Sequence, residues 1–228
     1  MTSWKILSVG GSIIVPQGGF DIDFLKGFRA LILKRIRQGE KFIIVIGGGA
    51  PCREYQNAAR ALGKVTPQDL DWIGIGMTKV NAEFVRVLFG DLAHSEILSD
   101  PTKKVKTKKP LIVAGGWKPG FTTDHSAVKF AQSYGVTEVY NLSNISYVYD
   151  KDPKKFVDAV KIERTDWKHF CAEIIPKDRT PGMNTPFDPM ASKVAKKLNL
   201  KVSFVDGRNL KQVEKALSGK KFAGTIIE

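Results

Sequence analysis

The sequence contains little cysteine and little histidine. Its two cysteines, Cys52 and Cys171, are far apart and lack CxxC spacing, and its three histidines are scattered. We therefore expect neither a disulfide framework nor a metal site built from protein side chains. No apolar stretch approaches the ~20 residues that cross a bilayer, and the start MTSWKILSVGG lacks the basic region of a signal peptide. The sequence predicts a cytoplasmic protein with no membrane partner.

Positive charge is in clear excess. The 228 residues include 36 lysines and arginines against 23 acidic residues, a formal net charge of +13. This excess favours anionic partners such as nucleotides, acidic metabolites or nucleic acid. The chain has no nucleic-acid recognition motif and no interleaving of aromatic and basic residues, so we expect no nucleic-acid partner. The lysine run TKKVKTKKP, residues 102–110, is either a solvated loop or a secondary anion site.

Strand and helix signals alternate along the chain, as in α/β proteins with a parallel sheet. Strands are expected within residues 4–11, 41–49, 110–116, 138–142, 201–207 and 223–228, and helices within 21–39, 51–63, 66–90, 187–200 and 209–219. Thr66, Asp188 and Asn209 are the expected N-caps of the last three helices. The patterning is weakest between about residues 150 and 187, and no clean domain boundary is visible.

Three of the expected strands end in glycine clusters: VGGS (9–12), IGGGA (46–50) and AGGW (114–117). The carboxyl ends of parallel strands share one edge of the sheet, where α/β proteins bind ligands. Glycine at this edge lets phosphate oxygens approach backbone N–H groups. The clusters match neither the P-loop pattern nor the dinucleotide fingerprint GxGxxG. They predict a site for a large phosphorylated ligand, or for two ligands side by side.

Seven further segments stand out along the chain: GGSIIVP (10–16), GGGAPCREY (47–55), DWIGIGMTKVNA (71–82), GGWKPGFTTD (115–124), NISYVYDKDPKK (144–155), FDPMASK (187–193) and GTII (224–227). In this order, over nearly the whole chain, they resemble the amino acid kinase superfamily, most closely its archaeal-type UMP kinases and their small bacterial relatives. The resemblance implies a three-layer α/β/α sandwich with a mostly parallel central sheet. It also implies one amino acid kinase domain over residues 1–228, with UMP bound by about 1–135 and ATP by about 136–228.

The family's activity is transfer of the ATP γ-phosphate to UMP in pyrimidine biosynthesis, with Mg²⁺ held through the nucleotide phosphates rather than by a protein metal site. Family members are usually hexamers, built as trimers of dimers. The UMP positions that the resemblance implies are Gly47, Gly48, Arg53, Asp71, Thr122 and Thr123, and the ATP positions are Gly10, Gly11, Ser12, Ser143, Tyr149 and Asp152. Asp124, Asp188 and Lys118 are the implied catalytic residues.

Each role has a plainer alternative. Arg53 can grip phosphate with two parallel hydrogen bonds, or can be a solvated helix residue. Asp71 can accept bonds from ribose hydroxyls, or can simply favour the helix start. Residues 122–124 and Asp188 can serve as N-caps instead of binding phosphates. Lys118 can be an ordinary loop lysine.

The chain departs from the family pattern at four positions. Ser8 stands where bacterial UMP kinases have a lysine, and we expect Lys118 to supply the missing cation. Ala50, Ser146 and Tyr147 replace other family residues near the nucleotides. These departures leave two alternatives open: a kinase of the same fold that acts on a carboxylate or a small phosphate, and a catalytically degenerate protein that binds a nucleotide or an oxyanion.

Overall fold

The computed structural model describes residues 4–176 and 185–228. Its main feature is a seven-stranded sheet with the order β3-β2-β1-β4-β8-β9-β7. The strands are β1 (Trp4–Val9), β2 (Lys41–Ile46), β3 (Leu111–Ala114), β4 (Glu138–Ser143), β7 (Arg164–Thr165), β8 (Lys201–Asp206) and β9 (Gly224–Ile227). The first five in this order are parallel, and β9 runs antiparallel to β8. The expected mostly parallel sheet is confirmed.

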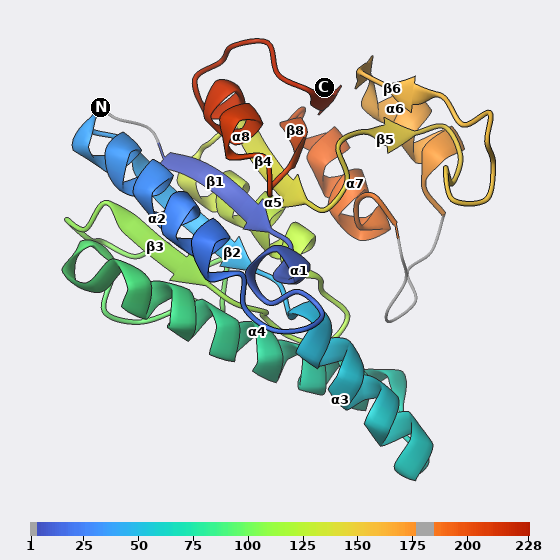
Figure 1. The fold of residues 1–228 in the computed structure, drawn as a ribbon, viewed down its shortest axis with the longest axis horizontal. Helices are drawn as coiled ribbons and strands as arrows, with labels where there is room; N and C mark the ends of the chain where they lie inside the picture. Colours follow the sequence, from blue (N-terminus) through green and yellow to red (C-terminus); the bar gives the residue numbers. More distant parts are fainter. Residues whose placement is uncertain (1–3, 177–184) are drawn as a thin grey trace.

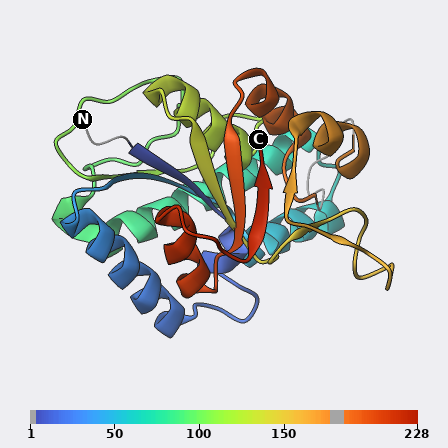
Figure 2. The same ribbon diagram turned by 90° about the horizontal axis from the view of Figure 1, so that it is seen from above.

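Helices cover both faces of the sheet (Figures 1 and 2). One face packs against α2 (Ile22–Arg37), α4 (Pro67–Phe89) and α8 (Leu210–Leu217), and the other against α5 (Thr123–Tyr134), α6 (Trp167–His169) and α7 (Pro189–Lys197). Alternate side chains of each strand supply the two cores: Leu7 and Ile44 face the first set of helices, and Ile6 and Ile43 face the second. The three-layer arrangement is therefore confirmed.

Helix α3 (Gly49–Leu62) packs beside α4 and extends away from the sheet (Figure 1). The expected N-caps are present: Thr66 forms a capping box with Asp69, and Asp188 and Asn209 cap α7 and α8. No helix within residues 4–176 and 185–228 is both long and apolar enough to cross a membrane.

The weakly patterned region contains short elements that the sequence did not indicate. These are β5 (Val148–Tyr149), paired with β6 (Lys161–Ile162), together with β7, α6 and the π-helical turn η2 (Phe170–Ile174). A short helix α1 (Gly11–Ile14) after β1 and a 3-10 turn η1 (Gly90–Leu92) after α4 were also not expected.

The lysine run lies in the connection that leads into β3, and several of its side chains make local contacts. Lys104 lies over the Tyr134 ring, Lys109 donates to the Asp91 carbonyl oxygen, and Lys103 pairs with Asp100.

Backbone contact between two glycine turns fixes the edge of the sheet at which the parallel strands end. Val9 at the end of β1 lies beside Ile46 at the end of β2, so the turns that follow meet at one level. A Cβ atom at Gly11 would lie 1.9 Å from the Gly49 nitrogen, and Gly49 itself has a positive φ of 75°. Only glycine allows two main chains to approach this closely.

We predict that Gly11→Ala destabilises the protein by at least about 2 kcal/mol, because the added methyl group pushes the two turns apart. Urea unfolding measures the change. The matched control is Gly63→Ala, since Gly63 has an extended backbone and no atom lies within 4 Å of the place its methyl group would take. Equal stability of the two variants would contradict the role given to the contact.

Candidate active site

The carboxyl ends of the parallel strands bring together most of the residues expected from the sequence. Gly10, Gly47 and Gly115 follow β1, β2 and β3 directly, and these three strands are neighbours in the sheet. The predicted convergence of the three glycine turns on one edge is therefore confirmed. The first N–H groups of a helix have no acceptor within that helix, and the Gly11 and Gly49 amides at the starts of α1 and α3 donate to no backbone oxygen among residues 4–176 and 185–228.

The glycines after β3 serve a different purpose. A Cβ atom at Gly115 would meet Lys79 at 3.3 Å, and one at Gly116 would meet the Thr78 hydroxyl at 2.9 Å. The Gly116 N–H donates to that hydroxyl at 2.7 Å. These two glycines therefore allow α4 to pack closely against the turn after β3.

Asp124 lies at the centre of the site, one residue into α5. Its Oδ1 accepts hydrogen bonds from the Ser8 hydroxyl on β1 and from the Asn141 amide on β4, both at 2.9 Å. The N-cap of α5 is Thr122, whose side chain accepts from the His125 N–H. The capping alternative therefore applies to Thr122, and the Asp124 carboxylate faces the strand ends.

Burial raises the pKa of Asp124 to about 6, and the neighbouring Asp188 carboxylate contributes to this rise. Hydrogen bonds from Ser8, the Asp188 backbone N–H and Asn141 oppose this shift. Asp188 is buried and caps α7 through its Oδ1, which accepts from the Ala191 N–H at 2.7 Å. One residue therefore both caps α7 and places a second carboxylate beside Asp124.

A cavity of about 180 Å³ adjoins this cluster between α3, α4 and the start of α5. Four of the six predicted UMP residues line it: Gly48, Asp71, Thr122 and Thr123. Other lining residues had not been expected, and they include Cys52, Gln56, Thr78, Gly116 and Phe121.

Asp71 holds one wall of this cavity in place. Its Oδ2 accepts from the Gly120 N–H at 2.7 Å, which ties the loop after β3 to α4. The helix-start alternative does not account for this contact across the cavity. Gly74, one of two glycines inside α4, also lines the cavity, so the missing side chain leaves room there.

Arg53 and Lys118 do not line this cavity. Arg53 is exposed on α3, close enough to Cys52 to oppose the rise that burial causes in the pKa of the Cys52 thiol. The Lys118 ammonium lies 4.2 Å from the centre of the Trp117 ring and 5.0 Å from that of Phe121. Phe121 lines the cavity, so its ring lies between the Lys118 ammonium and the cavity.

The predicted ATP residues fall into two groups. Gly10, Gly11 and Ser12 form the turn between β1 and α1, and Ser143 ends β4 with a buried hydroxyl that has no hydrogen-bond partner in the described part of the chain. Tyr149 lies on the separate β5–β6 pair. Asp152 follows it, and its side chain accepts from the Lys154 N–H. The two groups therefore belong to different sheets of the fold.

Several polar residues of the site were not predicted. Asn81 of α4 is buried and donates to the carbonyl oxygens of Gly47 and Gly48 at 2.9 and 3.1 Å. Ser8 and Asn141 hold Asp124. Each of these is a polar residue within an otherwise apolar strand or helix face, and that pattern was the available signal.

The departures from the family pattern lie in different places. Ala50 is buried, and its N–H donates to the Val15 carbonyl oxygen, so a larger side chain has little room there. Ser146 is exposed, and Tyr147 lies beneath the Lys161 ammonium. Within residues 4–176 and 185–228, no group of three or more histidine, cysteine or acidic side chains gathers as a metal site.

Comparisons with known proteins give a consistent family relationship. The model of the amino acid kinase family matches residues 3–206. The uridylate kinase of Methanocorpusculum labreanum is 30% identical over 225 residues, covering 97% of this chain and 94% of that protein. That of Methanocaldococcus jannaschii is 30% identical over 228 residues, covering 98% of each. The solved structure of uridylate kinase from Archaeoglobus fulgidus matches with a TM-score of 0.83 at 28% identity, over the whole of both chains.

We predict that Asp124→Asn stabilises the protein at neutral pH. An aspartate whose folded pKa is about 6 binds its proton more tightly than the unfolded chain does, so the ionised group destabilises the fold above that pH. The variant should gain up to about 3 kcal/mol at about pH 7.5, and the gain should shrink as pH falls through 6 towards 4.

Urea unfolding without nucleotide at the two ends of this range tests the prediction, with the exposed Asp152→Asn as control. A gain of equal size at both pH values, or a loss at neutral pH, would show that desolvation of the Asp124 charge is not the dominant effect.

Proposed function

We propose that this chain, which belongs to the amino acid kinase family, is a UMP kinase that transfers the γ-phosphate of ATP to UMP and so supplies UDP for pyrimidine nucleotide synthesis. Full-length similarity to archaeal uridylate kinases supports this function. The observation that carries it is the cavity beside the glycine turns, where the Asp71 carboxylate and two threonines meet at the same edge as Asp124.

UMP occupies the cavity between α3, α4 and α5. The Asp71 carboxylate accepts bonds from the ribose hydroxyls, because two acceptor oxygens suit two neighbouring O–H donors. Thr122 and Thr123 donate hydroxyl hydrogens to the base or phosphate. Gly47 and Gly48 lie beside the UMP phosphate, and Arg53 reaches it from the exposed face of α3 with two parallel hydrogen bonds.

ATP lies across the neighbouring turn. The amides of Gly11 and Ser12, together with Gly10, bind the β- and γ-phosphates at the start of α1. The Ser143 hydroxyl binds the adenosine, together with Tyr149 and Asp152 from the side of the β5–β6 pair. Residues 1–228 thus form one domain in which about 1–135 bind UMP and about 136–228 complete the ATP site.

Phosphoryl transfer needs the two phosphates in line and positive charge around the transferring group. The paired carboxylates of Asp124 and Asp188 suit Mg²⁺, which favours oxygen ligands and stays largely bound to nucleotide phosphates. When bound, Mg²⁺ neutralises charge on the phosphates. Lys118, held over Trp117 at the edge of the cavity, supplies a further cation in place of the lysine absent at position 8.

We also propose that the protein works in the cytoplasm as a homo-oligomer, a hexamer built as a trimer of dimers. Trp72, Gly76, Val80 and Val87 lie on the exposed side of α4, and Gly76 has no atom within 4 Å of a Cβ position. A second subunit packed here would bury the apolar side chains and would offset the cost of glycine within a helix.

An ADP-release assay with ATP and a panel of acceptors tests the proposed reaction. We expect UMP to give the highest kcat/KM, with CMP lower and with no turnover of carbamate or acetylglutamate, since an acyl acceptor has no ribose for Asp71 to bind. Preference for an acyl acceptor would assign the chain to another kinase of this fold. Tight binding of UMP and ATP without UDP formation would identify a degenerate binding protein.

The same assay under single-turnover conditions tests Lys118, with Lys118→Met compared with the exposed Lys64→Met. A cation at the transferring phosphate contributes far more than about threefold to the rate. A loss below that factor would remove Lys118 from the mechanism.

For the oligomer we predict that Val80→Asp shifts the protein to a smaller species, as measured by light scattering after size exclusion. Val80 is 62% exposed in the isolated chain, and a buried, unpaired carboxylate would break the contact. Val157→Asp is the matched control, because Val157 is fully exposed and lies away from α4. If the assembly of Val80→Asp had the same mass as that of the unmodified protein, the exposed face of α4 would be excluded as the subunit contact.

A further inference from the structure

A second cavity, of about 390 Å³, is separate from the candidate active site, since none of its lining residues lines the cavity beside Asp71. It is bounded by β7, β8, β9 and the connection from α8 to β9. Its lining residues include Lys201 at the start of β8 and Gly224, which pairs with Val205 near the end of β8, so the cavity runs along this strand. Lys201 lies five residues from Asp206, the last residue of β8, which is about 17 Å at the usual rise of a strand. The cavity is therefore not an extension of the active site.

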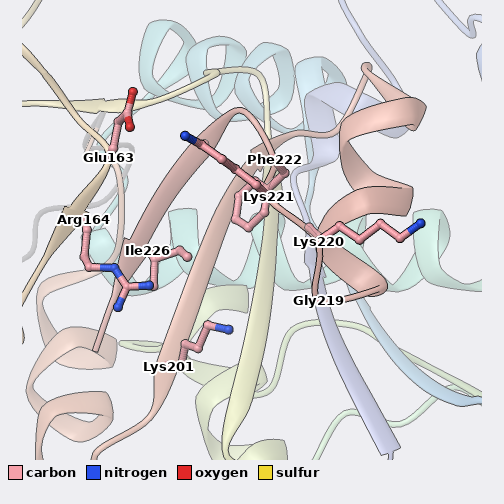
Figure 3. A pocket seen from close by; sticks show the side chains of 10 residues that line it. Glu163, Arg164, Lys201, Gly219, Lys220, Lys221, Phe222 and Ile226 are labelled. Carbon is pink, nitrogen blue, oxygen red and sulfur yellow. The ribbon is translucent and has the colours of Figure 1, made fainter.

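The walls of this cavity are strongly basic. Four of its lining side chains are cationic, Arg164, Lys201, Lys220 and Lys221, and one, Glu163, is acidic. They come from three separate segments of the chain, so the charge gathers only in the folded protein (Figure 3).

Partners for these charges are unevenly distributed. Lys201 pairs with Glu138 at 2.9 Å, and Arg164 pairs with Glu228. Glu163 is already bound by Lys161 at 2.9 Å. Lys220 and Lys221 form no salt bridge within the described part of the chain, but they interact electrostatically with Glu214 and Glu163, each of which already pairs with another lysine. Among the side chains that line the cavity, cations therefore outnumber carboxylates by four to one.

The shape of the cavity suits a small molecule. Its volume lies in the range of ligand sites, about 300–1,000 Å³. Phe222, Ile226 and Ala216 supply apolar surface beneath the charged groups. Figure 3 shows the Lys221 ammonium above Phe222 and the Lys201 ammonium on the far side of the cavity, with Lys220 extending the other way along α8.

The end of α8 does not repel an anion, although a helix C-terminus carries partial negative charge. The Leu217 carbonyl oxygen at this end accepts bonds from the Lys5 ammonium and from the Arg35 guanidinium, at 3.0 and 2.7 Å. These cations neutralise the terminus. The turn at Gly219, with φ of 67°, is followed by Lys220, which extends along α8, and by Lys221, whose ammonium lies on the side of Phe222 (Figure 3).

We propose that this cavity binds a small anion with two or more linked phosphates. Its cationic side chains come from three separate segments of the chain, and linked phosphates can contact more of them at once than a single phosphate can. Lysine ammonium groups bind phosphate as point charges. This site accounts for part of the net charge of +13, which the phosphate transfer at the candidate active site does not require.

Magnetic resonance of protein with isotope-labelled glycine tests this site separately from the active site. Gly219 and Gly224 line the second cavity, whereas Gly11 and Gly48 lie at the catalytic edge. Inorganic tripolyphosphate is the probe. We expect saturable shifts of the Gly219 and Gly224 amide signals at millimolar concentration or below. The result does not depend on whether the chain phosphorylates UMP, because the Gly11 and Gly48 signals report binding at the candidate active site separately.

Two double variants assign the shifts. Lys220→Gln with Lys221→Gln should weaken the binding at least about tenfold, because it removes two of the four cationic side chains that line the cavity. Lys103→Gln with Lys104→Gln removes equal charge from the lysine run on another part of the surface, and should change the binding less than about twofold.

The proposal is overturned if Gly219 and Gly224 do not shift, if both double variants weaken binding equally, or if inorganic phosphate binds as tightly as tripolyphosphate. A nucleoside triphosphate that shifts the same signals about tenfold more tightly than tripolyphosphate would support the site and identify the ligand as a nucleotide. Equal affinity would also support it, with recognition limited to the phosphate chain.

Discussion

The contact between the turns after β1 and β2 is the constraint on which the catalytic edge depends. Gly11 and Gly49 touch through their main chains, and a single added methyl group at Gly11 has no room. The contact sets the starts of α1 and α3 side by side. Asn81 reinforces it from α4 through two bonds to the turn after β2. Two glycine turns in contact suit the proposed reaction between two nucleotides.

The second constraint is electrostatic. Asp124 is desolvated beside Asp188, and the position where bacterial UMP kinases have a lysine is occupied by Ser8, a neutral donor. The pKa of Asp124 is therefore raised instead of lowered, and its ionised form is unfavourable in the protein alone. In the proposed reaction, cations that arrive with the nucleotides would relieve this repulsion, so the protein would give up stability in the free state for a site that favours a cation-bound ligand.

Local signals made most of the fold predictable. Helix periodicity and caps such as Thr66 and Asn209 act within a few residues, so the long helices and strands were confirmed. The missed elements depend on distant partners: β7 pairs with β9, which is far from it in the sequence.

The same limit applies to the site. Asp124 was recognised from its motif, but its bonds to Ser8 and Asn141 require knowing that β1 and β4 are neighbours, and the basic cavity requires three segments to meet.

The most direct test of the account is a crystal structure with a dinucleotide in which a phosphate chain links uridine to adenosine. The account predicts uridine in the cavity beside Asp71, with the phosphate chain against the amides of Gly11, Ser12, Gly48 and Gly49. A dinucleotide bound elsewhere on the molecule, with no phosphate at either glycine turn, would contradict it.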